Sequence, residues 1–269
     1  MNRRGITMVL ALLATLPGTA RADCDLTHLP PFAARYQVTA LGGLATVGEY
    51  RISLTQTGAD RFRYETVSHP VGIVAWFKNE RLLERSDWTL DGQAIRPEDT
   101  LYQKRVGDKN RVIRTTFDWP AHHAVQVDDG RTKVLDIHDG VLDRILFQVA
   151  LMRDLIQQRT PLEYRFVDKG RLKTFRFKVM GRETVGTPMG DFEAVKLKRV
   201  PLPGEKADYV WAAPRLCYLP VRIAYWKSEG PAFNVLLRSL DGHLNPNAPA
   251  QARVPAASAE ATVGTPAPR

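Results

Sequence analysis

The sequence predicts a mainly β protein: a single curved antiparallel sheet or partly open β-barrel, connected as a meander, with one main α-helix packed on its concave face. Three observations predict this class. Apolar and polar residues alternate with the two-residue period of a half-buried strand through most of the chain. Turn dipeptides recur about every ten residues. One segment, 139–161, instead carries the signals of a helix.

The expected strands follow one another along these alternating runs. The chain is expected to reverse at the dipeptides Asp91-Gly92, Asp129-Gly130 and Lys169-Gly170. The runs are 34–41, 48–58, 60–68, 81–97, 111–119, 123–137 and 161–181. Because short turns join them, neighbouring runs are expected to pair antiparallel.

Residues 139–161 predict the one long helix. Asp139 is expected to cap it and Pro161 to stop it. Phe147 and Leu151 fall outside the main apolar stripe, so the helix is apolar on nearly all sides and should pack against the sheet. That stripe consists of Val141, Leu142, Ile145, Leu146, Val149, Met152 and Ile156. A shorter helical turn is expected within 72–80.

The glycine-rich segment 179–197 raises the question of a phosphate-binding loop. Such a loop needs the pattern G-x-x-x-x-G-K-[ST] between a strand and a helix. Gly181 and Gly186 have the spacing, but Pro188 removes an amide donor and a strand-like run follows. We therefore expect a hairpin corner, with 183–187 leading up, 188–190 turning and 192–200 returning.

The two ends of the chain differ in composition from the middle. Residues 1–22 have a basic start, a short apolar run and a small-x-small ending, which predicts a cleavable Sec-type signal peptide and a periplasmic protein. Residues 245–269 are rich in alanine and proline and are expected to form a disordered tail. Residues 23–244 remain as a single β-rich domain.

Cys24 and Cys217 are the only cysteines. In an oxidising compartment two lone cysteines usually pair, and a bridge here would close nearly the whole domain into one loop. Two unpaired thiols stay open as the alternative, because sequence gives no distance.

The net charge of +9 comes from 38 basic and 29 acidic residues, and part of it belongs to the two terminal segments. The basic residues of the domain are spread out rather than clustered with aromatic platforms, so no nucleic-acid partner is expected. Peripheral contact with anionic lipid headgroups stays open. The oligomeric state is not predicted.

The hairpin corner and the sequence after it resemble the DUF3108 family. The family pattern is G-x-E-x-x-x-T-P-x-G-x-[FY], followed by W and then by L-P-V-[RK]. The residues of this sequence that match it, and that we expect to be structural, are Gly181, Glu183, Pro188, Gly190 and Pro220. The resemblance covers about 35–240. It implies a curved, mostly antiparallel sheet in exported bacterial proteins of undefined function, and it supplies no catalytic residues. The cysteine pair is not regarded as a family feature.

The sequence offers few candidates for chemistry, and no catalytic, metal or cofactor site is predicted. The tryptophans either line a ligand cavity or form core: they are Trp76, Trp88, Trp119, Trp211 and Trp226. His122 and His123 are adjacent and would face opposite sides of a strand, and Ser68-His69 lacks the geometry of a nucleophile and its base. Glu183 is expected to pair with an arginine such as Arg199 or Arg222.

Three functions follow from these observations. The first is a non-enzymatic carrier of an apolar or amphipathic ligand such as a lipid, held between sheet and helix. The second is an envelope assembly or interaction protein that uses exposed strand edges. The third is an enzyme of unrecognised type, which would need His122, Asp128 and Glu183 to converge.

Overall fold

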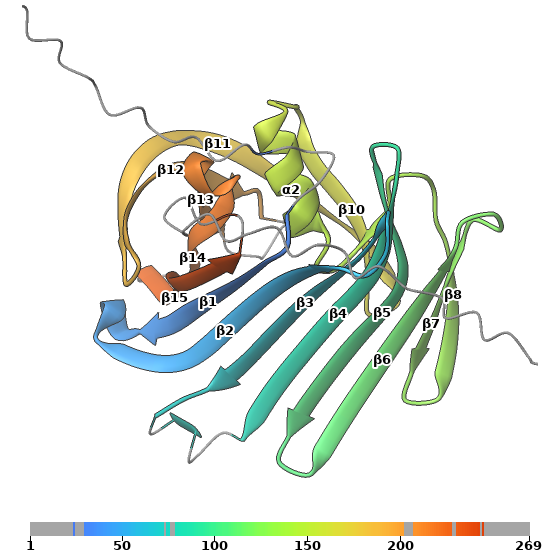
Figure 1. Ribbon diagram of the computed structural model, residues 1–269. Coiled ribbons are helices and arrows are strands. Elements are labelled where there is room, and N and C mark those ends of the chain that lie inside the picture. The colour runs from blue at the N-terminus through green and yellow to red at the C-terminus, as the bar shows by residue number, and fades with distance from the viewer. Residues whose placement is uncertain are drawn as a thin grey trace, which may run out of the picture.

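The computed structural model describes Cys24 and residues 30–72, 74–75, 79–201, 207–227, 230–242 and 244. The predicted signal peptide, the predicted tail and residues 73 and 76–78 of the short helical turn expected within 72–80 lie outside these residues. The mainly β prediction is confirmed, since the described residues form one large curved sheet and one α-helix (Figure 1).

The sheet runs in the order β8-β7-β6-β5-β4-β3-β2-β1-β15-β14-β13-β12-β11-β10-β9. All neighbours pair antiparallel except β9 and β10, which are parallel. The strands are β1 (Phe32–Ala40), β2 (Ala45–Gln56), β3 (Arg61–Pro70), β4 (Glu80–Asp91), β5 (Ala94–Val106), β6 (Lys109–Asp118), β7 (His123–Asp128), β8 (Arg131–Asp136), β9 (Leu142–Asp143), β10 (Leu162–Asp168), β11 (Arg171–Thr187), β12 (Gly190–Arg199), β13 (Asp208–Ala213), β14 (Leu219–Lys227) and β15 (Gly230–Gly242).

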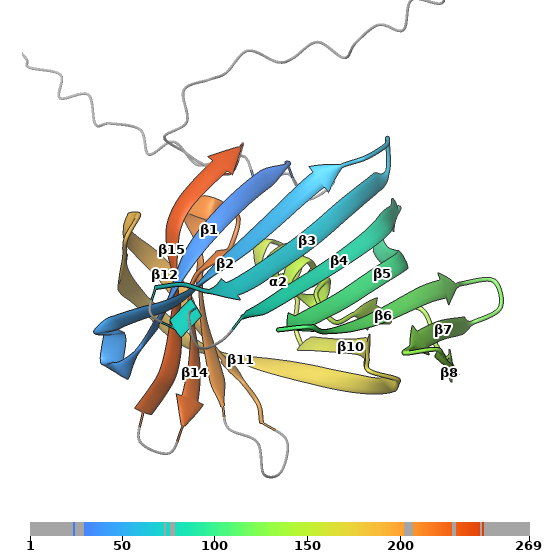
Figure 2. The same cartoon turned by 90° about the horizontal axis from the view of Figure 1, so that it is seen from below.

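The first and last long strands meet in the middle of this order. Tyr36 on β1 lies opposite Tyr50 on β2 and Leu237 on β15, so two meanders grow outward from one shared strand. The sheet curls around the helix α2 (Phe147–Ile156), which lies inside the curve (Figure 2). The predicted packing of one helix on the concave face is therefore confirmed.

The segment 179–197 forms the expected hairpin between β11 and β12 rather than a phosphate loop. The Thr187 hydroxyl accepts the Met189 N–H at 3.2 Å and donates to the Gly190 carbonyl at 2.8 Å. Gly190 has φ 129°, a conformation that side chains with a Cβ rarely adopt. Gly181 lies at a register shift in the same hairpin, and Pro188 lies in its turn.

The helix begins later than the sequence predicts. Asp139 is not its cap: Gly140 takes φ 83°, and Leu142 and Asp143 form β9 beside β10. The Asp143 carboxylate instead accepts the backbone N–H groups of Ile145 and Leu146 at 2.8 and 3.0 Å. These amides lie just before α2, so Asp143 holds the chain where the helix starts.

The β9 end of the sheet approaches the interior strand β4 through side chains. We call this contact the seam and define it by Glu84 and Ser86 on β4 and by Asp143, Arg144 and Asp168 from β9 to β10. Ser86 donates a buried hydrogen bond to Asp143. Arg144 lies 3.2 Å from Glu84 and 3.9 Å from Asp168. The seam brings the sheet close to a barrel without a backbone ladder between β9 and β5 in the described chain.

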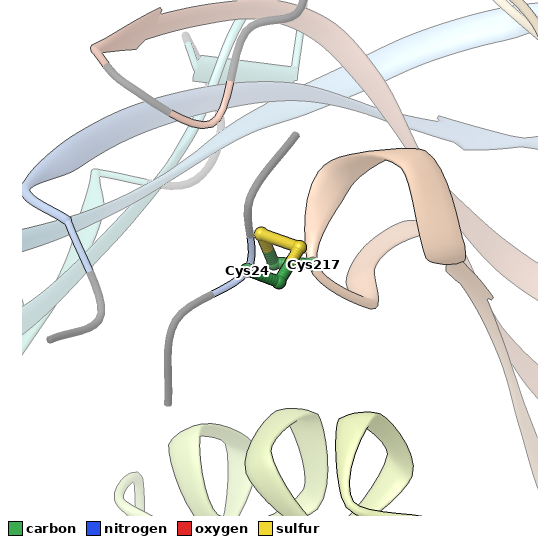
Figure 3. Close-up of a disulfide and its surroundings, with 2 residues drawn as sticks. All are labelled: Cys24 and Cys217. Atoms are coloured by element: carbon green, nitrogen blue, oxygen red, sulfur yellow. A yellow bond between two sulfur atoms is a disulfide. The ribbon is translucent and has the colours of Figure 1, made fainter. Parts of the chain in front are cut away.

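The predicted disulfide is confirmed. Cys24 and Cys217 are bonded, with their Cα atoms 5.4 Å apart and a sequence separation of 193 residues. Cys217 follows the short 3₁₀ turn Pro214–Leu216 and is buried in the core. Figure 3 shows α2 running beneath the bond. The bridge therefore ties the segment before β1 to the turn between β13 and β14.

Replacement of Cys24 by serine should lower the free energy of unfolding by about 4–5 kcal/mol, because the unfolded chain regains the entropy of a very long loop. Urea unfolding of Cys24→Ser and of the wild type, each with and without a reductant, measures this difference. The reductant should move the wild-type midpoint and leave the variant unchanged. Equal midpoints for the two oxidised proteins would contradict the role given to the bridge.

Replacement of Asp143 by asparagine should change how stability depends on pH. Burial raises the pKa of Asp143 above its ordinary value of about 3.9. The stability linked to this carboxyl is then fully present below pH of about 4 and is lost as the pH rises through the raised value.

Asparagine does not ionise. The free energy of unfolding of Asp143→Asn should therefore increase relative to that of the wild type as the pH rises above about 4. Its amide can donate to Ser86 while its oxygen accepts the two backbone amides. Urea unfolding across this pH range tests the effect, with Asp108→Asn in the exposed β5–β6 turn as control. A difference between wild type and Asp143→Asn that stays constant with pH would contradict the prediction.

Candidate functional site: a cavity between helix and sheet

A cavity of about 990 Å³ lies between the first half of α2 and the concave face of the sheet. Its walls come from β1–β4, β10–β15 and the segment that leads into the helix. Five of the residues that line it are exposed and mark where it reaches the surface: Glu49, His69, Lys169, Tyr225 and Phe233. The cavity is therefore open to the surface rather than a sealed void.

Four phenylalanines form one apolar wall of the cavity. Phe147 from α2 packs against Phe166 on β10 at 5.9 Å between ring centroids and edge-on against Phe175 on β11 at 5.2 Å. Phe166 and Phe175 lie 4.6 Å apart, and Phe177 completes the group at 6.1 Å from Phe147. All four line the cavity. This phenylalanine wall is an apolar surface that a ligand could contact without displacing polar side chains.

Buried tyrosines hold elements around the cavity in place through hydrogen bonds. The Tyr36 hydroxyl donates to the Pro220 carbonyl at 2.9 Å, and Pro220 lines the cavity. The Tyr64 hydroxyl donates to Gln148 of α2 at 3.0 Å and so links helix to sheet. Burial raises the pKa of Tyr36, Tyr64 and Tyr50, which keeps these phenols neutral.

A charged band crosses the cavity on the side of the seam. It consists of Glu84, Arg144, Asp168, Arg199 and Asp208. Arg199 pairs with Asp208 at 2.8 Å and lies 5.0 Å above the Phe175 ring. Burial raises the pKa of Glu84, and the nearby Arg144 opposes that shift. The band adjoins the phenylalanine wall, so the lining has an apolar part and a charged part side by side.

The cavity lies toward one end of the curved sheet, which we call the mouth end. The mouth end comprises the connections β1–β2, β3–β4, β5–β6, β7–β8, β10–β11, β12–β13 and β14–β15. The opposite helix end carries the remaining turns, including the β4–β5 turn, where Arg153 of α2 donates to the Gln93 carbonyl at 2.5 Å. The helix therefore occupies one end of the curve and leaves the other to the cavity.

The lining is not made of the predicted tryptophans. Trp88 is buried and stacks on Phe62 at 4.7 Å, while Trp119 donates to the Pro97 carbonyl at 2.9 Å. Trp211 and Trp226 lie outside the lining as well, and Trp76 lies outside the described residues. Alternation along a strand places side chains on two faces without saying which face is concave, so tryptophan positions alone could not identify the cavity.

A signal for the cavity was nevertheless present in the sequence. The predicted reversal at Lys169-Gly170 places Phe175 and Phe177 on one face of a strand, opposite the run that contains Phe166. Three phenylalanines on one face of a hairpin, next to a helix that is apolar on nearly all sides, indicate an aromatic surface between sheet and helix.

Glu183 lies on the convex face and holds Trp211. The Trp211 indole N–H donates to Glu183 at 2.6 Å, and the Lys196 ammonium lies 3.3 Å from the same carboxylate. The Arg222 guanidinium lies 4.4 Å above the Trp211 ring, whereas Arg199 pairs with Asp208. The expected arginine partner of Glu183 is thus replaced by an indole and a lysine. These contacts lower the pKa of Glu183, chiefly through the Trp211 hydrogen bond.

The candidates for catalysis lie apart from one another. His122 is in the β6–β7 turn at the helix end, while Asp128 ends β7 and pairs with Arg111 at 2.6 Å. Glu183 is several strands away on β11. His123 lies 3.3 Å from Asp136, but the described residues include no group of three or more metal ligands. Within this same part of the chain, no helix is long and apolar enough to cross a bilayer.

Truncation of Glu183 should loosen Trp211 without changing the cavity. Glu183→Ala is expected to lower the free energy of unfolding by about 1 kcal/mol through loss of a charge-assisted hydrogen bond at a partly exposed site. Urea unfolding gives the energy, and tryptophan fluorescence should report a more solvated indole. Glu163→Ala, which removes an exposed pair with Arg176, is the matched control. An unchanged midpoint and spectrum for Glu183→Ala would contradict this assignment.

Comparison with known proteins agrees with this fold. The chain is similar to a β-barrel-like protein of domain DUF1849 from Brucella abortus, with 10% identity, a TM-score of 0.50, and coverage of 80% of this chain and 98% of that one. At such identity the likeness shows the fold alone.

Two further structures cover 78% of this chain and 95% of their own, both at 11% identity. One, from Bacteroides fragilis, is thought to be exported and has a YmcC-like fold, with a TM-score of 0.31. The other, from Parabacteroides distasonis, is thought to be a lipoprotein, with a TM-score of 0.32. No curated protein sequence matches the chain. Residues 35–232 match the family model DUF3108, described as a protein of unknown function, and the chain therefore belongs to the DUF3108 family.

Proposed function

We propose that this protein is an exported, non-enzymatic carrier that holds an amphipathic ligand such as a lipid between α2 and the sheet. The observation that carries the proposal is the open cavity of about 990 Å³ with its phenylalanine wall. Small-molecule sites commonly measure about 300–1,000 Å³, so this space suits a ligand at the upper end of that range.

The lining favours a ligand with two chemically different parts. An acyl or similar chain would pack on Phe147, Phe166 and Phe175, where it would find little competition from polar groups. A polar head would lie toward Arg144 and Asp168, which belong to the charged band. A purely apolar ligand would leave this band without a partner from the ligand.

The disulfide supports a location outside the cytoplasm. Cys24 and Cys217 form a bond that persists in oxidising compartments and is rare in the cytosol. Residues 1–22 have the composition of a signal peptide, which would direct the chain to the periplasm. A carrier in this compartment would move molecules that are poorly soluble in water between envelope sites.

The two alternative functions find less support. The edge strand β8 pairs only with β7 among the described residues, but its charged residues Arg131, Lys133 and Asp136 discourage the addition of another strand. The enzyme hypothesis required His122, Asp128 and Glu183 to converge, and they lie on separate elements.

Filling the cavity should weaken ligand binding. The protein, purified without detergent, is extracted with organic solvent and its lipids are identified by mass spectrometry; affinity is then measured with a fluorescent fatty acid. Val210→Trp and Ile223→Trp place a large side chain in the lining and should weaken probe binding by about tenfold or more. Val179→Trp, at a position that is 57% exposed and outside the lining, should bind like the wild type.

Circular dichroism confirms that each variant folds before its affinity is compared. Specific extraction of one lipid class, together with weaker probe binding in both cavity variants, supports the carrier. Absence of both extracted lipid and saturable probe binding in the wild type would overturn it, as would equal affinity in the wild type and both cavity variants.

A further inference from the structure

Exposed large apolar side chains gather at the mouth end. They are Leu44, Val106, Leu172, Tyr225, Trp226 and Phe233, with exposed fractions from 39% to 91%. Four other exposed apolar residues lie along β7, β8 and β11, and none lies in the described turns of the helix end. The distribution is one-sided, which solubility alone does not require.

Basic residues gather at the same end. Residues 104–111, 128–133 and 168–173 include the β5–β6, β7–β8 and β10–β11 turns and carry nine basic and four acidic residues. The helix-end turns at 56–61, 91–94, 118–123, 187–190 and 213–218 carry two basic and three acidic residues. The β5–β6 and β7–β8 turns both lie along the lower edge of the molecule in Figure 1.

The basic excess persists after the ion pairs are considered. Lys104 pairs with Glu80 at 2.7 Å and Lys173 with Asp168 at 2.6 Å. Arg111 pairs with Asp128. Six basic residues of these three turns are then left with two further carboxylates in the same turns. The β10–β11 turn also contacts β8, since a Cβ on Gly170 would lie 3.0 Å from Lys133 Cδ, so two of the basic turns adjoin.

We infer that the mouth end docks on the surface of a bilayer that contains anionic lipids. Leu44 lies in the β1–β2 connection, Leu172 lies at the start of β11 beside the β10–β11 turn, and Trp226 lies near the end of β14. Apolar groups spread singly over several turns suit insertion among headgroups better than a flat protein interface, which needs one continuous patch. The basic turns complement the lipid phosphates.

Docking in this orientation would set the cavity opening against the bilayer. Tyr225 and Phe233 form a cross-strand pair that is exposed and also lines the cavity. A ligand could then pass between membrane and cavity beside these rings without crossing open water. This last step rests on the proposed carrier function, whereas the docking itself does not.

Vesicle flotation with the full mature chain tests the inference. Vesicles of phosphatidylcholine mixed with phosphatidylglycerol should bind the protein, pure phosphatidylcholine should bind it much less, and added salt should weaken binding. Lys109→Glu and Arg171→Glu should each weaken binding by about fivefold or more. Leu44→Asp and Leu172→Asp should each weaken it by about tenfold.

Matched controls come from surfaces that are not expected to touch lipid. Arg61→Glu reverses a charge beside the β2–β3 turn at the helix end, and Val179→Asp places a carboxylate on an exposed part of β11. Both should float like the wild type. Loss of flotation in the four mouth variants but not in the controls supports docking. Docking is overturned if the wild-type protein binds neither vesicle type, or if the mouth variants bind vesicles as well as the wild type does.

The fatty-acid probe separates this test from that of the carrier. The four mouth variants lie outside the cavity lining and should bind the probe like the wild type. Failed flotation with intact probe binding would overturn docking alone. Intact flotation without saturable probe binding would overturn the carrier alone.

Discussion

The seam is the contact on which the rest of the structure depends. The β9 end of this fifteen-stranded sheet meets the interior strand β4, and side chains rather than a backbone ladder make the contact. Asp143 bonds Ser86 across the gap and also accepts the amides that precede α2. One carboxylate therefore fixes both the closure of the sheet and the position of the helix.

A closure made of side chains has a cost and a consequence. The buried carboxylates Asp143 and Glu84 both have raised pKa values because burial disfavours their charged forms, so the seam is stable only while their hydrogen bonds and the Arg144 pair remain. The consequence is that the charged band lies at the edge of an apolar cavity. A continuous ladder would have closed the barrel more firmly, but it would have offered no polar side chains to a ligand.

The sequence predicts what depends on neighbours in the chain. Strands, reversals at Asp129-Gly130 and Lys169-Gly170, and the corner near Pro188 follow from local periodicity and turn chemistry, and the structure confirms them. The predicted start of the helix was wrong because Leu142 and Asp143 pair with β10, which follows later in the chain. No local pattern in the sequence encodes that contact. The cavity residues were missed for the same reason. Which face of each strand is concave depends on the curl of the whole sheet.

The two ends of the molecule are built under different constraints. The disulfide and the second half of α2 lie at the helix end, where the Arg153 contact to Gln93 also ties helix to sheet. At the mouth end the same strands finish in turns with exposed apolar and basic side chains. Leu44 is 91% exposed, so its side chain contributes little to the packing of the strands. Exposed apolar groups at the mouth end are a liability for solubility, and the proposed docking on a bilayer gives them a role outside folding.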